Sequence, residues 1–141
     1  MARREVRRWI AAPPANVFDA LGSYVVSFAW LGQNRHCPPT AALSVQVGAP
    51  VTCPLRRGMC RLCITAAEPA QLLVIDVASA GHIVRVQSSM TPQNDGTLFV
   101  CTTECCDVLS TPMPSVVSHI YQGFGRMPSD IKRIVEARQM P

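Results

Sequence analysis

The chain has 141 residues, of which 48% are hydrophobic and only 16% are charged, and its formal net charge is +4 at pH 7. A chain of this length is expected to fold as a single domain over residues 1–141 with a substantial core. No apolar run approaches the ~20 residues that a membrane span needs, and no continuous apolar signal region follows the basic N-terminus, so we expect a cytoplasmic protein without a membrane span.

The first predicted element is a strand that ends before Pro13 and carries Arg3, Arg4, Arg7 and Arg8. We interpret these arginines as charges that protect an exposed edge strand from pairing with other chains. The alternative is a surface that attracts phosphates or acidic partners. Because no aromatic residues are interleaved with the arginines, no nucleic acid is expected as a partner.

Two short helices are predicted after this strand. Pro13 and Pro14 mark the start of the first, because the first helical turn has no intrahelical acceptor for its N–H groups, and Gly22 is predicted to end it. Ser23 is predicted to cap a second helix that Gly32 closes. Their apolar residues are Val17, Phe18, Leu21, Tyr24, Val25 and Phe28.

From Ala41 to Leu109 the hydrophobic pattern has a period of two, and turn residues divide it into strands. Together with the first strand this predicts about seven strands, joined by short turns and therefore antiparallel. Asn94-Asp95-Gly96 is the strongest hairpin signal. The predicted strands are Leu43–Val47, Val51–Leu55, Cys60–Thr65, Leu72–Val77, His82–Met90 and Thr97–Leu109.

Seven cysteines are an odd number without a secretory context, so disulfides are not expected. Cys60 and Cys63 form a C-x-x-C motif, and Cys105-Cys106 adds a second close pair. Cys60 and Cys63 fall in a predicted strand, where residues three apart point to opposite faces, whereas a zinc site needs them on one tight turn. We therefore expect no metal and interpret the cysteines as buried thiols, with structural zinc as the alternative.

The last segment changes to helical periodicity, with Thr111 as a predicted cap and Pro112 at the first position. Pro128 interrupts the apolar stripe without changing its phase, which favours one kinked helix over a break at which Ser129 caps a new helix. The stripe consists of Met113, Val117, Ile120, Phe124, Met127, Ile131 and Ile134.

This order of elements predicts an α+β fold in which a curved antiparallel sheet wraps its apolar face around the long C-terminal helix. The chain resembles the START-like, or SRPBCC, superfamily of polyketide cyclases/dehydrases and lipid-transport proteins. The residues that carry the resemblance are the strand-to-helix opening Ile10–Leu21, Trp30, the hairpin Asp95-Gly96-Thr97 and the amphipathic end Ile131–Val135. The resemblance implies a helix-grip fold, and Gln33–Thr40 and Pro128 depart from its pattern.

The resemblance also implies a cavity between the sheet and the long helix, and its polar residues suggest candidate chemistry. Cyclisation or dehydration of a polyketone needs a base and a donor to the enolate oxygen. We predict His82 as acid or base, Arg57 as oxyanion partner and Tyr121 as a donor from the helix. Glu104 joins them only if the Leu98 face of its strand is the inner one. The alternatives are that His82 is a half-solvated histidine at a turn, that Arg57 extends its guanidinium to water and that Glu104 is an exposed carboxylate.

The expected function is therefore a cofactor-independent cyclase or dehydratase acting on a polyketide-like or other apolar molecule, the alternative being a non-catalytic carrier or sensor of a hydrophobic ligand. No cofactor is expected. The expected partners are a hydrophobic small molecule and, as an open alternative, a second copy of the chain. The residues predicted to bind the ligand are Tyr24, Phe28, Trp30, Val84, Val86, Ser88, Met90, Val117, Ile120 and Phe124.

Overall fold

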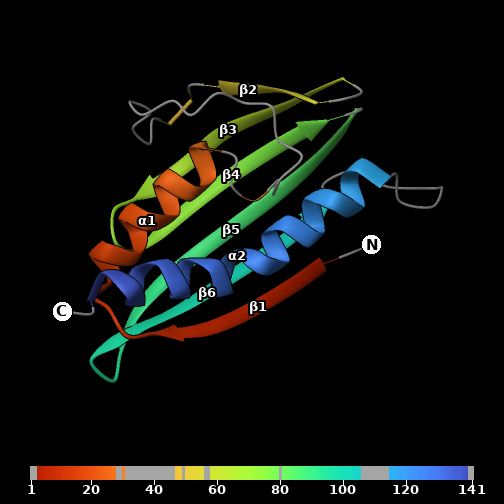
Figure 1. The fold of residues 1–141 in the computed structure, drawn as a ribbon. Coiled ribbons are helices and arrows are strands. Elements are labelled where there is room, and N and C mark those ends of the chain that lie inside the picture. The colour runs from red at the N-terminus through yellow and green to blue at the C-terminus, as the bar shows by residue number, and fades with distance from the viewer. Residues whose placement is uncertain are drawn as a thin grey trace.

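A computed structural model of the chain describes residues 3–27, 30, 47–48, 50–55, 58–79, 81–105 and 115–139, of which the side chains of 50–55, 58–59, 115–117 and 139 are not described. These residues form six strands and two helices, as Figure 1 shows. The elements are β1 (Arg3–Ile10), α1 (Pro14–Val26), β2 (Pro50–Leu55), β3 (Gly58–Glu68), β4 (Leu72–Ser79), β5 (His82–Gln93), β6 (Gly96–Cys105) and α2 (Ser115–Gln139).

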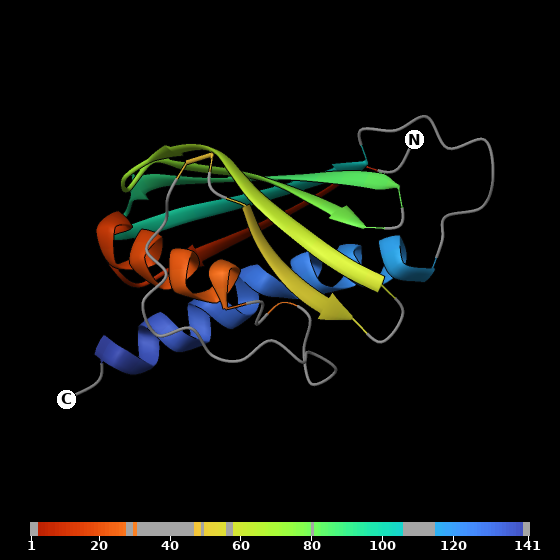
Figure 2. The same cartoon turned by 90° about the horizontal axis from the view of Figure 1, so that it is seen from above.

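The strands form one antiparallel sheet in the order β1-β6-β5-β4-β3-β2. The first strand therefore pairs with the last, which makes β1 one edge of the sheet. Asn94 and Asp95 connect β5 to β6 with positive φ angles, the conformation that the predicted hairpin turn needs. Figure 2 shows both helices on the same face of the twisted sheet. The α+β fold class and the covering of the sheet by a long C-terminal helix are as expected.

α2 continues through Pro128, so the hypothesis of one helix is confirmed and a new helix at Ser129 is not formed. Pro128 has no N–H, and the carbonyl of Phe124 consequently lacks its helical donor. The buried Cys101 thiol of β6 compensates, because its Sγ donates to the Phe124 oxygen over 3.8 Å. The predicted cap Thr111 lies outside the described residues. Within the described segments, no helix combines the length and the apolar character that a bilayer span requires.

The apolar stripe of α2 packs onto the inner face of the sheet and onto α1. Trp30 stacks on Phe124 with ring centroids 4.5 Å apart, and both side chains are fully buried. Burial of side chains of this size is the main favourable contribution to the stability of the fold. The buried hydrophobic core residues that α2 contributes are Ile120, Tyr121, Phe124, Met127, Ile131 and Val135.

The prediction that Gly22 ends a first short helix is wrong. α1 continues through Gly22 and Ser23 to Val26, and Ser27 caps its C-terminus. A glycine inside a helix costs about 1 kcal/mol relative to alanine. The burial of Val25 and Val26, which follow Gly22 in the same helix, outweighs this cost.

The predicted strand Leu43–Val47 is described only at its last residue. Val47 forms an isolated parallel bridge with Ile64 of β3, and the N–H of Gly48 donates to the Ile64 carbonyl. The last residue of the predicted strand therefore contacts β3, and its residues 43–46 lie outside the described part of the chain. The described part of the sheet has six strands where the sequence predicts about seven.

Candidate functional site

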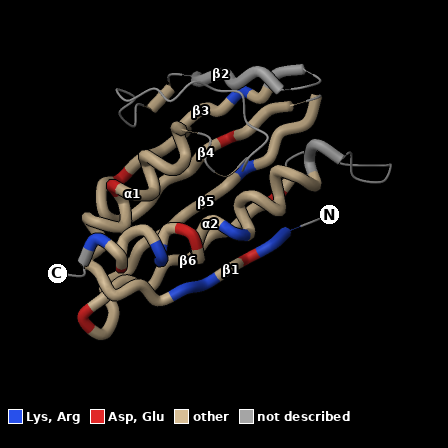
Figure 3. Tube along the Cα trace, viewed as in Figure 1, with Lys and Arg blue, Asp and Glu red and all other residues tan. Residues whose placement is uncertain are grey.

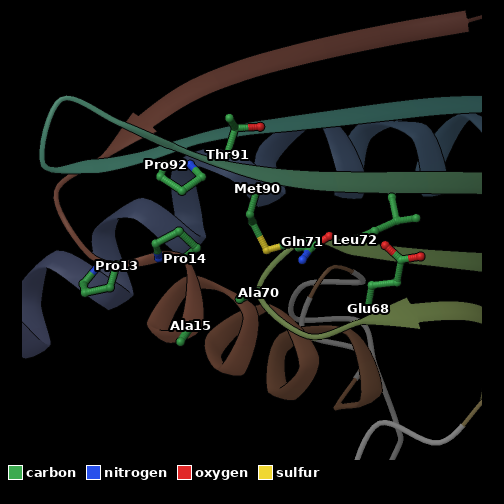
Figure 4. Close-up of a pocket in the computed structure, with 10 residues that line it drawn as sticks. All are labelled: Pro13, Pro14, Ala15, Glu68, Ala70, Gln71, Leu72, Met90, Thr91 and Pro92. Atoms are coloured by element: carbon green, nitrogen blue, oxygen red, sulfur yellow. The ribbon is translucent and has the colours of Figure 1, made fainter.

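A groove of about 710 Å³ opens where the N-terminus of α1 faces the β3–β4 turn and the end of β5. Figure 4 shows Met90 reaching toward Gln71 in this groove. Most of the wall is apolar, and the polar side chains are those of Glu68, Gln71 and Thr91. The lining residues are Pro13, Pro14, Ala15, Glu68, Ala70, Gln71, Leu72, Met90, Thr91 and Pro92.

Backbone geometry fixes two of the walls. Pro13 has an extended conformation, with φ −63° and ψ 151°, and Pro14 begins α1 directly after it. Proline is suited to this place because its ring restricts φ and because the first turn needs no N–H. The two rings therefore form a rigid apolar wall.

The opposite wall is the β3–β4 turn, in which Ala70 has a φ of +63°. The N–H of Gln71 donates to the carbonyl of Glu68, and the carbonyl of Gln71 accepts from the N–H of Met90 over 2.9 Å. The second bond joins the turn to β5. The position of this wall relative to β5 is consequently fixed by backbone hydrogen bonds.

The groove is lined mainly by apolar groups and has few side chains that could take part in a reaction. Its lining contains no histidine, cysteine, serine or lysine. One carboxylate, one amide and one hydroxyl are the side chains that can orient a ligand by hydrogen bonds. The arrangement therefore suits an apolar molecule with one or two polar groups.

Glu104, one of the predicted catalytic residues, does not lie on the inner face of the sheet. Phe99, Cys101 and Cys105 of β6 are buried on the inner face, so Glu104 points to the opposite face. There it lines a second pocket of about 140 Å³ together with Arg3 and Arg85. Glu104 is thus not a cavity carboxylate, which corrects the conditional prediction.

The structure describes the positions of His82 and Tyr121 but not that of Arg57. His82 is the first residue of β5, lies opposite Ser79 of β4 and is half-buried. Tyr121 is buried on α2. Arg57 lies outside the described residues, so its predicted role as oxyanion partner stays a prediction.

The predicted inner face of β5 has the expected orientation. Val84, Val86, Ser88 and Met90 are all buried, in phase with one another as the alternation predicts. Of the described residues that we predicted to bind a ligand, Met90 alone lines the groove.

Two of the aromatic residues predicted to bind the ligand, Trp30 and Tyr24, contribute to the packing of the helices. Trp30 is buried against Phe124, and its Nε1 donates to the carbonyl of Val25 over 3.2 Å. The Tyr24 hydroxyl donates to Oδ2 of Asp130 over 2.6 Å and so joins α1 to α2. Burial, followed by this bond to the Asp130 carboxylate, raises the pKa of Tyr24 well above its usual value.

Of three further residues that we predicted to bind the ligand, the structure describes the side chain of one. Ile120 is buried on α2 beside Phe124. Phe28 lies outside the described residues, as does the side chain of Val117. Their roles as ligand contacts stay predictions.

Cys60 and Cys63 lie on β3 with Cys60 buried in the core and Cys63 half-buried opposite Asp76. Their side chains therefore point to opposite faces of the sheet, as the strand interpretation requires. Burial raises the pKa of the Cys60 thiol to about 12 and that of Cys101 to about 11. The described part of the chain has no group of three or more His, Cys, Asp or Glu side chains placed to hold a metal ion.

No feature of the sequence predicts the groove as a whole, although parts of it are recognisable. Pro13 and Pro14 are recognisable as a helix start, and Glu68-Pro69-Ala70 as a turn. Nothing local in the sequence indicates that these segments face each other, because their proximity follows from the order of the strands.

No model of a known protein family matches the chain, and no curated protein matches it. Solved structures do. The chain is similar to protein CV1439 from Chromobacterium violaceum, with a TM-score of 0.68 and 16% identity over 95% of this chain and 96% of that one. It is also similar to Aha1 from Colwellia psychrerythraea, solved as a dimer, with a TM-score of 0.67 and 15% identity over 96% and 97% of the two chains.

A third similar structure is Ara h 8.0201, with a TM-score of 0.65 and 14% identity over 97% of this chain and 96% of that one. DynU16, a protein in the dynemicin biosynthetic locus, gives a TM-score of 0.57 and 15% identity over 92% of this chain and 48% of that one. Identities this low establish a shared fold alone. The chain has the fold of these proteins, in agreement with the helix-grip fold that its START-like resemblance implies.

Proposed function

We propose that the chain is a single helix-grip domain that binds a hydrophobic small molecule, and that the groove between α1 and the β3–β4 turn is its binding site. The observation that carries the proposal is the groove itself, whose volume of about 710 Å³ lies in the range of small-molecule sites. The START-like resemblance, which implies carriers of lipids or hormones among its members, supports the same class of ligand.

The composition of the groove favours binding without reaction. An apolar wall with a single carboxylate, Glu68, lacks the pair of an acid or base and an oxyanion donor that enolate chemistry needs. Glu104, which was to complete such a set, lies on the other face of the sheet. The carrier or sensor is therefore the better supported of the two hypotheses.

The test uses Nile red, a neutral dye that fluoresces in apolar sites. Ala15 is exposed and lines the groove, so Ala15→Trp fills the groove without changing the core. The matched control is Asn16→Trp, at the next exposed position of α1, which does not line the groove. Ala15→Trp is expected to weaken Nile red binding by about tenfold, and Asn16→Trp to leave it unchanged. Equal binding by both variants and the parent chain would refute the assignment.

A cofactor-independent cyclase or dehydratase is the second candidate. Its support is the placement of His82 at the inner edge of β5 and the fold shared with DynU16 of a biosynthetic locus. Native mass spectrometry of the purified protein would identify a copurifying molecule and its chemical class. The enzyme hypothesis then predicts that His82→Gln lowers product formation from that class of molecule while leaving binding unchanged.

A further inference from the structure

The positive charge of the chain is concentrated on one edge of the fold. β1 and α2 contain eight of the 13 basic residues and three of the nine acidic residues. These two elements alone therefore carry an excess of five positive charges, against +4 for the whole chain. Figure 3 shows basic residues along β1 and along α2 from near its middle to its C-terminal end.

The acidic residues of these two elements are already paired within them. Each makes an ion pair with a basic neighbour of the same element, at N–O distances of 2.8 to 3.2 Å. The pairs are Arg7–Glu5 on β1 and Lys132–Glu136 and Arg133–Asp130 on α2. The remaining arginines consequently have no acidic residue left on β1 or α2.

Two of these arginines extend from β1 onto consecutive turns of α2. The guanidinium of Arg4 lies against Gly125, where a Cβ would come within 2.7 Å of its Cζ. The Nε of Arg8 donates to Oγ of Ser129 over 3.2 Å. Because Gly125 and Ser129 are four residues apart, the two guanidinium groups lie on one side of the helix.

Arg126 is an exposed residue of α2 that directly follows Gly125, and its Nη2 donates to the carbonyl of Trp30 over 3.4 Å. Among the residues that the structure describes, no ion pair reaches Arg4, Arg8 or Arg126. We call these three residues the arginine strip. Their contacts on α2 and Trp30 are with neutral groups, so no ion pair among the described residues compensates their charge.

We propose that the arginine strip is the docking surface for an acidic segment of a partner protein. The guanidinium fork matches the two oxygens of a carboxylate, and three such groups on β1 and α2 suit a segment with several Asp or Glu residues. A second copy that docked through its own arginine strip would bring like charges together, so charge complementarity argues against a symmetric dimer at this surface.

The neighbouring groups also favour a protein over a nucleic acid or a membrane. Trp9 is the exposed aromatic residue of β1, but its ring is covered by Lys132 at 5.6 Å and its Nε1 donates to the carbonyl of Gln93. It is not free to stack on a base. The other exposed large apolar residues of the described chain, Val47 and Ile83, lie on neither β1 nor α2, so no apolar anchor accompanies the strip.

The partner is recognised through side chains more than by addition of a strand to β1. The carbonyl of Arg7 accepts from Nη1 of Arg8, and the carbonyl of Trp9 accepts from Nζ of Lys132. These bonds occupy main-chain acceptors that an added strand would otherwise use. The edge therefore resists pairing with other strands while its arginines stay accessible to carboxylates.

The experiment measures the fluorescence anisotropy of a labelled poly-glutamate peptide with the full chain. The double variant Arg4→Gln/Arg8→Gln removes two charges from the strip, and Arg61→Gln/Arg138→Gln removes two exposed charges elsewhere. Affinity is expected to fall about tenfold in the strip variant and less than about threefold in the control. Arg126→Gln supplies a second perturbation of the strip, and circular dichroism verifies that each variant is folded.

An equal loss in both double variants would show that only the overall charge matters, and would overturn the proposal. Absence of binding by the parent chain would overturn it too. Tighter binding to duplex DNA or to phosphatidylserine vesicles than to the peptide, lost in the strip variant, would assign the strip to another class of partner and likewise reject this one.

Discussion

Replacement of Gly123 by alanine tests the packing of α2 on Trp30. A Cβ at residue 123 would lie 2.1 Å from the carbonyl oxygen and 3.1 Å from the carbonyl carbon of Trp30. Both are backbone atoms, so α2 and the backbone of Trp30 must move apart to accommodate the added Cβ. That movement separates Trp30 from Phe124, whose rings are stacked at 4.5 Å.

The expected cost combines three contributions. Overpacking costs about 1–3 kcal/mol, and loss of the aromatic contact costs about 0.5–1.5 kcal/mol. Alanine gains about 1 kcal/mol over glycine in a helix. We therefore expect Gly123→Ala to lower the free energy of unfolding by about 2 kcal/mol, which corresponds to a fall in Tm of about 5–8 °C for a chain of this size.

Gly125→Ala is the matched control in the same helix. Its Cβ would meet the guanidinium of Arg4 at 2.7 Å, and this end of a flexible side chain can move away. The variant should be as stable as the parent chain or more stable by up to about 1 kcal/mol. Urea unfolding followed by tryptophan fluorescence measures both variants. Equal stability of the two variants would refute the packing argument.

Two further predictions concern hydrogen bonds to α2. Tyr24→Phe removes the bond to Asp130 and should cost about 1–2 kcal/mol. Because the folded-state pKa of Tyr24 is raised, its contribution is complete below the ordinary pKa of 10.0 and is lost as the pH rises toward the folded value. Thermal unfolding should therefore show a smaller alkaline loss of stability in Tyr24→Phe, and an unchanged loss would contradict this. Pro128→Ala restores an N–H for the Phe124 carbonyl, so Cys101→Ala should be less costly in that background, with a coupling of about 0.5 kcal/mol by double-mutant cycle. Zero coupling would show that the thiol does not replace the missing donor.

The sequence predicted those parts of the fold in which only one face of the strand or helix is apolar. On β5 the alternation from Val84 to Met90 assigns the inner face correctly, since its other face is polar. The stripe of α2 keeps its phase across Pro128, and the helix is continuous there. In both segments a single arrangement buries the apolar side chains.

The sequence was insufficient where two arrangements bury similar apolar surface. β6 is apolar on both faces, with Leu98 and Val100 on one and Phe99 and Cys101 on the other, so its orientation depends on contacts with α2. The placement of Glu104 follows from that orientation. The groove depended likewise on tertiary arrangement, because it joins α1 to a turn that is far away in the chain.

The most direct test of hydrophobic ligand binding is amide NMR mapping of the chain titrated with the copurifying molecule or with Nile red. The proposal predicts the largest shifts at Ala70, Gln71 and Thr91, which line the groove on two elements, and predicts that Ala15→Trp suppresses them. Shifts confined to other surfaces, or no shifts at saturating concentrations of a panel of apolar molecules, would contradict the account.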